Sequence, residues 1–116
     1  MDVGELLPKI SSLSYLFTEG NGATVAHCLD LDIVATGKDR QTAERRLDAL
    51  IRAQIRTIAT KFNFADLSVR APQEYWDAFY EASEFKKTHL ELKVPPIVVA
   101  VEQKVAIPVF MRAFAA

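Results

Sequence analysis

The sequence has few of the residues and segments that mark a secreted or membrane protein. A single cysteine, Cys28, excludes a disulfide bond within the chain and is typical of a reducing compartment. The longest apolar stretch, Val94 to Val101, is too short to span a bilayer. The amino-terminal segment carries Asp2 and Glu5 instead of the basic and then apolar pattern of a signal peptide. We therefore expect a cytoplasmic protein that does not insert into the membrane.

The net charge of the chain is also small. A formal charge of −1 over 116 residues gives no global attraction to nucleic acid or to an anionic membrane. The residues are 50% hydrophobic and 25% charged, which is typical of a globular protein. Residues 1–116 are expected to form one domain. A chain of 116 residues buries only a modest hydrophobic core, so oligomerisation is a natural way to bury more apolar surface.

The first half of the chain predicts three strands followed by a long helix. Residues 13–18 and 23–28 are extended segments on either side of Gly-Asn-Gly, a strong hairpin signal. A third short strand is predicted over residues 33–36. Asp39 suits the N-cap of a helix over residues 38–62, whose apolar residues recur at helical spacing. These apolar residues are Ala43, Leu47, Leu50, Ile51, Ile58 and Phe62, with Gln54 on the same stripe.

The second half predicts one more helix and one more strand. Pro72 favours the first turn of a helix over residues 73–85. The β-branched run at residues 97–101 predicts a buried strand, with a continuation through residues 102–105 left open. We therefore expect an α+β fold, an antiparallel sheet in the order β-β-β-α-(α)-β with the long helix on one face. The second helix has too many large apolar residues for one narrow stripe, so one or two aromatics are expected to be exposed or at an interface. Its apolar residues are Tyr75, Trp76, Phe79, Tyr80 and Ala82.

One segment carries a resemblance to a known family. A hairpin strand precedes the run V-A-H-C-L-D-L-D-I-V-A-T-G at residues 25–37, and a helix then opens on Asp39 with Ala43 and Leu47. This pattern resembles the HicB-like domain of type II toxin–antitoxin antitoxins, with the best match over residues 13–60. The resemblance implies a partial RNase H-like arrangement of three strands, a helix and a further strand.

The resemblance also implies a function. It points to a non-catalytic, oligomeric antitoxin that binds and masks a small basic ribonuclease toxin. Antitoxins of this kind often carry a separate DNA-binding segment that regulates their operon. The carboxy-terminal extension, residues 72–116, offers neither a basic recognition helix nor a strand rich in Arg and Lys, so DNA binding is not expected.

Four residues near the end of the second predicted strand are candidates for chemistry. His27 and Cys28 are zinc-ligand types, but neighbouring residues on a strand point to opposite faces and do not share one ion. Asp30 and Asp32 would share a face of an extended segment, as the carboxylates of a metal-dependent nuclease do. A turn between two strands is the simpler interpretation. We expect no catalytic site, no metal and no cofactor, and keep the nuclease as an alternative hypothesis.

The two predicted helices differ in charge. The first is net basic, whereas the second has carboxylates three, four and three residues apart, which aligns them in one stripe. The simplest interpretation is that both charged faces are exposed to solvent. Two alternatives stay open: charge complementarity within or between subunits, and contact of the basic face with RNA. Because a ribonuclease toxin should be basic, we expect it to bind the acidic stripe and adjacent aromatics. The alternative is a stand-alone homo-oligomer, at least a dimer. The predicted contact residues are Glu74, Asp77, Glu81, Glu84, Trp76 and Tyr80.

Overall fold

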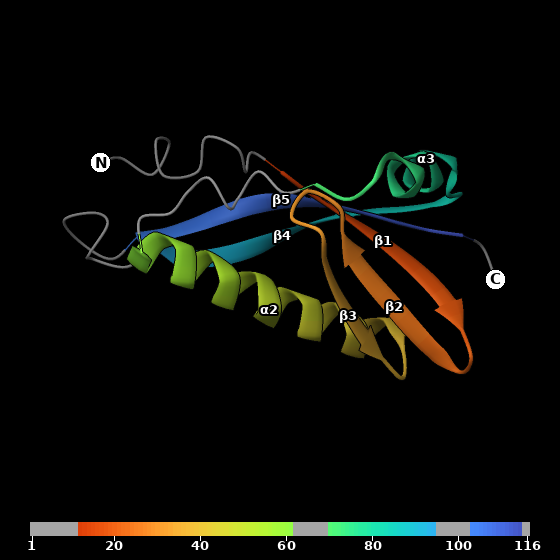
Figure 1. Cartoon of the computed structure of the whole chain (residues 1–116), viewed down its shortest axis with the longest axis horizontal. Coiled ribbons are helices and arrows are strands. Elements are labelled where there is room, and N and C mark those ends of the chain that lie inside the picture. Colours follow the sequence, from red (N-terminus) through yellow and green to blue (C-terminus); the bar gives the residue numbers. More distant parts are fainter. Residues whose placement is uncertain (1–11, 62–69, 95–102, 115–116) are drawn as a thin grey trace.

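A computed structural model, which describes residues 12–61, 70–94 and 103–114, shows an α+β fold with a five-stranded mixed sheet and two helices (Figure 1). The strands lie in the order β3-β2-β1-β5-β4. Helix α2 packs on one face of this sheet and α3 on the other. The elements are β1 (Leu13–Gly20), β2 (Ala23–Cys28), β3 (Ile33–Gly37), α2 (Arg40–Lys61), α3 (Gln73–Glu81), β4 (Glu84–Val94) and β5 (Gln103–Ala113).

The hairpin of β1 and β2 forms where the sequence predicts it. Asn21 and Gly22, the two residues of the turn, both have positive φ, at 53° and 75°. Positive φ at both positions matches the right-handed twist of the flanking strands, and Asn and Gly tolerate it best. Strand β3 then pairs with β2 in antiparallel register, from Cys28 opposite Ile33 to Thr24 opposite Gly37. The three predicted strands of the first half are confirmed.

Helix α2 begins as predicted. The Oδ1 atom of Asp39 accepts a hydrogen bond of 2.7 Å from the backbone N–H of Thr42, which satisfies one of the free donors of the first turn. The helix start also lies very close to β3, since a Cβ atom added to Gly37 would lie 2.5 Å from the backbone nitrogen of Ala43. Neither α2 nor α3 is long and apolar enough to cross a membrane.

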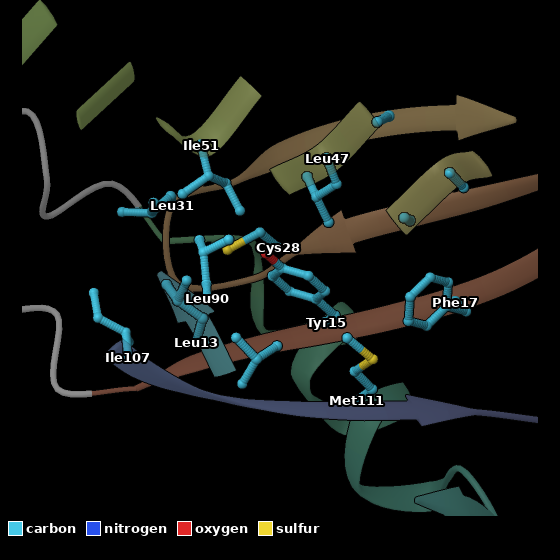
Figure 2. Packing of buried hydrophobic residues seen from close by; sticks show 14 of the residues in the cluster. Leu13, Tyr15, Phe17, Cys28, Leu31, Leu47, Ile51, Leu90, Ile107 and Met111 are labelled. Atoms are coloured by element: carbon cyan, nitrogen blue, oxygen red, sulfur yellow. The ribbon is translucent and has the colours of Figure 1, made fainter. Parts of the chain in front are cut away.

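The buried side of α2 follows a four-residue spacing. Ala43, Leu47, Ile51 and Ile55 pack on the sheet, and Figure 2 shows Leu47 and Ile51 pointing towards the side chains of β1 and β2. The predicted apolar stripe was wrong at Leu50, which is 46% exposed. Side chains four residues apart keep one line along the helix, and Leu50 falls beside that line. Of the other predicted members, Phe62 and the side chain of Ile58 lie outside the description.

The second helix is shorter than predicted. It ends at Glu81, and Ala82 is already extended, with φ −65° and ψ 138°. The predicted helix over residues 73–85 was therefore wrong in its last turn, because Glu84 and Phe85 begin β4. The strand pairs with β5 in antiparallel register over its whole length. A continuous ladder with β5 stabilises the extended form over the local helical preference.

The sheet is mixed, where the sequence predicted an antiparallel one. Strand β1 pairs with β5 in parallel, beginning with Leu13 opposite Val109. Strand β5 contains Pro108, which lacks a backbone N–H, but Pro108 precedes the stretch that pairs with β1. The predicted strand at residues 97–101 lies outside the described residues, and β5 starts at Gln103 within the predicted continuation.

Candidate functional site

Residues 29–32 form the turn between β2 and β3, and its two carboxylates have separate partners. Asp30 accepts a hydrogen bond of 2.5 Å from the backbone N–H of Ser14. Asp32, at a positive φ of 52°, lies 2.7 Å from Nε2 of His27. Burial raises the pKa of Asp30, and the bond from Ser14 opposes this shift. The two carboxylates therefore stabilise the turn, and they do not converge as the ligands of a nuclease metal would.

His27 and Cys28 lie on opposite faces of the sheet, as the strand pattern predicts. The ring of His27 contacts Tyr75 of α3, with centroids 4.8 Å apart, whereas Cys28 is fully buried under α2. Burial, reinforced by the charge of Asp30, raises the pKa of the Cys28 thiol to about 12. A thiol that stays protonated is a poor nucleophile. In residues 12–61, 70–94 and 103–114, no three His, Cys, Asp or Glu side chains converge as metal ligands.

Two more acidic residues, Glu44 and Asp48, lie on α2. The buried Tyr15 hydroxyl donates a hydrogen bond of 2.7 Å to Oδ1 of Asp48. Burial raises the pKa of Asp48, and the bond from Tyr15 and the charge of Arg52 oppose the shift. One turn earlier, burial and the charge of Asp48 raise the pKa of Glu44. Asp48 and Glu44 are therefore half-buried acids, and Asp48 is held in place by its hydrogen bond to Tyr15.

Glu44 also lines a groove of about 540 Å³ between the start of α2, the start of β4 and the end of β5. At its rim, Arg40 bonds Glu19 at 3.2 Å and Glu84 at 2.5 Å, which ties α2 to β1 and β4. Sequence reasoning missed the groove because β4, one of its walls, was not predicted: Glu84 and Phe85 were placed at the end of a helix, and residues 86–94 were assigned to no element. The full lining is Phe17, Arg40, Gln41, Glu44, Glu84, Phe85, Lys86, Met111, Arg112 and Ala113.

The predicted acidic stripe is divided between two elements. Glu74, Asp77 and Glu81 are exposed along α3. Glu84 lies on β4 and is paired with Arg40, so it does not belong to the α3 surface. Asp77 accepts a hydrogen bond of 3.0 Å from Gln73. None of the three α3 carboxylates forms an ion pair with a residue whose position is described.

The two aromatic members of the predicted surface behave differently. Trp76 is 6% exposed, and the guanidinium of Arg70 lies 4.5 Å from the centre of its ring. It packs with Phe79 between α3 and the sheet, so it is removed from the candidate contact surface. Tyr80 is 65% exposed and stays in it. Tyr75 is exposed as well, which agrees with the expectation that one or two aromatics lie outside the core.

Beside α3, the same face of the sheet carries aromatic and cationic side chains that sequence reasoning missed. The Arg112 guanidinium lies 5.2 Å from the ring centres of both Phe79 and Phe85. Lys87 lies 5.5 Å above the ring of Phe110. Phe85 is 56% exposed. Had residues 84–94 been assigned to a strand, the two-residue period of a strand would have placed Phe85 and Lys87 on the same face.

Comparisons with protein-family models, curated proteins and solved structures give no match for this chain. Two surfaces stand out, and they adjoin on one side of the sheet: the exposed carboxylates of α3 with Tyr80, hereafter the acidic helix surface, and the β4–β5 face with Phe85, Lys87 and Arg112.

Proposed function

We propose that this chain is a non-catalytic, antitoxin-like binding protein of HicB-like fold, which masks a small basic ribonuclease through the acidic helix surface. The observation that carries the proposal is that three carboxylates are exposed and unpaired in the described chain. Glu74, Asp77 and Glu81 are exposed on one short helix and have no cationic partner within the described chain. Unpaired charges of one sign attract a partner of the opposite sign and orient its approach.

The exposed aromatic residue supplies the apolar part of such a contact. Tyr80 is 65% exposed and lies next to Glu81, and its ring centroid is 5.5 Å from that of the buried Phe79. Tyrosine is enriched at the centres of protein interfaces because it buries a large area at a small cost in side-chain entropy. Trp76 and Phe79 below it fix α3 on the sheet, so the surface is presented on a rigid support.

The test begins with isolation of the tagged chain from the cells that produce it. Support consists of a small basic protein bound at a stoichiometric level, which cleaves RNA once it is separated and stops when the chain is added back. If the chain repeatedly elutes alone in low salt, the antitoxin function is discarded. The stand-alone homo-oligomer then becomes the leading hypothesis.

A matched pair of variants assigns the surface. Asp77→Lys with Glu81→Lys should abolish binding of the basic protein, because it reverses two charges of the surface and leaves Glu74 at the helix start, where an acid favours the helix. Glu19→Lys with Glu91→Lys changes the net charge equally on other elements and should leave binding intact. If the Asp77→Lys, Glu81→Lys variant binds the basic protein as tightly as the control variant does, α3 is excluded as the contact.

A further inference from the structure

The described part of the chain covers the side of the sheet that carries α3 only in part. With nine residues, α3 is about 14 Å long, whereas five strands spaced about 4.8 Å apart span about 19 Å. Val34 on β3 and Phe85 on β4 remain exposed on this side. Their side is known because Val34 pairs with His27 and Phe85 with Arg112, and both of these partners contact rings of α3.

Charges of both signs also stay unpaired on this side. Lys87 and Arg112 form no ion pair in the part of the chain that is described, and the Nε atom of Arg112 is buried without a hydrogen-bond acceptor there. The carboxylates of α3 are exposed, while the inward residues of that helix, Trp76 and Phe79, pack on the sheet. The acids and the cations of one molecule thus lie on the same side but remain apart.

We propose that a second copy of this chain docks on this side about a two-fold axis, with the α3 helix of each copy on the open β4–β5 face of the other. The two sheets then enclose one layer that contains both α3 helices. Each helix contacts its own sheet through Trp76 and Phe79 and the opposite sheet through Asp77, Tyr80 and Glu81. A two-fold interface uses the same patch twice, so it joins both sets of charges at once.

Charge complementarity is what identifies a second copy as the occupant. The carboxylates of α3 meet Lys87 and Arg112 of the other molecule, and Tyr80 meets the exposed ring of Phe85. Pairing supplies an anion for Arg112, which has no ion pair in the described chain, and a planar guanidinium flanked by two rings is well suited to bind a carboxylate. The dimer does not depend on the proposed basic partner, which would compete with it for the same carboxylates.

The test is light scattering on the purified full-length chain in low salt. The wild type should have twice the 13.0 kDa mass of one chain. Asp77→Lys with Glu81→Lys should give a monomer, and so should Lys87→Glu. An equimolar mixture of these two variants should form a dimer again, because each acidic patch then faces a basic one. Lys86→Glu, on the opposite face of the same strand, is the matched control and should remain dimeric.

A second measurement uses the wild type alone, so it does not depend on the folding of any variant. A zero-length carbodiimide cross-linker should join Lys87 to Asp77 or Glu81 in a covalent dimer, identified by mass spectrometry of its peptides. A monomeric wild type would overturn the proposal. The proposal would also be overturned if both charge-reversal variants remained dimeric, or if the cross-links in the wild-type dimer joined only other residues.

Discussion

Replacing Tyr15 by phenylalanine isolates one polar contact inside the core. The ring of Tyr15 is fully buried and packs edge-on against Phe17, and phenylalanine keeps this packing. The substitution removes only the hydroxyl, which donates a 2.7 Å hydrogen bond to Asp48. A hydrogen bond to a charged group contributes about 1.5–3 kcal/mol, and we expect about 1.5–2 kcal/mol here because Asp48 is partly open to water. Urea unfolding at pH 7, followed by Trp76 fluorescence, measures this loss.

The loss of stability caused by Tyr15→Phe should also depend on pH, in a direction that the structure predicts. Burial already raises the pKa of Asp48 above its ordinary value of 3.8, and loss of the opposing Tyr15 bond raises it further. Between the ordinary and the raised pKa, the folded state binds more protons than the unfolded chain, so stability increases as the pH falls through that window. The cost of Tyr15→Phe should therefore shrink from pH 7 towards pH 4.

Asp48→Asn provides the reference for that pH dependence. In this background, Tyr15→Phe should cost only about 0.5–1.5 kcal/mol, the range for a bond between neutral groups, and the cost should no longer vary with pH. The reasoning fails if Tyr15→Phe costs less than about 0.5 kcal/mol at pH 7 in the otherwise natural chain. It also fails if the cost in that chain is the same at pH 4 and pH 7.

Two matched pairs of substitutions test the packing of α2. Leu47→Ala should lower the free energy of unfolding by about 2–5 kcal/mol because Leu47 is fully buried. Leu50→Ala, on the exposed side, should change it by less than about 0.5 kcal/mol. Equal effects of the two substitutions in urea unfolding would show that the buried side of α2 is misassigned. Gly37→Ala forces a methyl group against the backbone of Ala43 and should lower the free energy of unfolding by about 1–3 kcal/mol. Gly20→Ala is the control, because its methyl group meets open space. A thermal melt of Gly37→Ala that matches the wild type would contradict the close approach of α2 to β3.

The first half of the fold was predictable because its signals are local. The turn at Asn21 and Gly22 needs positive φ, and Asp39 caps the first turn of α2, so each signal acts within a few residues. The buried side of α2 was predictable in part. Leu47 and Ile51 were placed correctly, but the side towards which Leu50 turns depends on where the helix meets the sheet.

The second half depends on contacts between residues far apart in the sequence. In β4, adjacent Lys86 and Lys87 hide the alternation that appears clearly only at Leu90 and Leu92, and it is the ladder with β5 that makes the segment a strand. The candidate surface was affected in the same way. The acids of α3 were identifiable from their spacing, whereas the burial of Trp76 was decided by which side of α3 packs on the sheet.

The parallel pairing of β1 with β5 has a consequence for the order of events during synthesis on the ribosome. The hairpin, β3 and α2 emerge early, yet the apolar cluster that contains Leu13 and Leu47 also requires Val109 from β5. Until β5 is made, one edge of β1 lacks this partner strand and the cluster stays incomplete. Nascent chains with such open edges are prone to associate with one another, so the interval before β5 emerges is when this protein has most need of a chaperone.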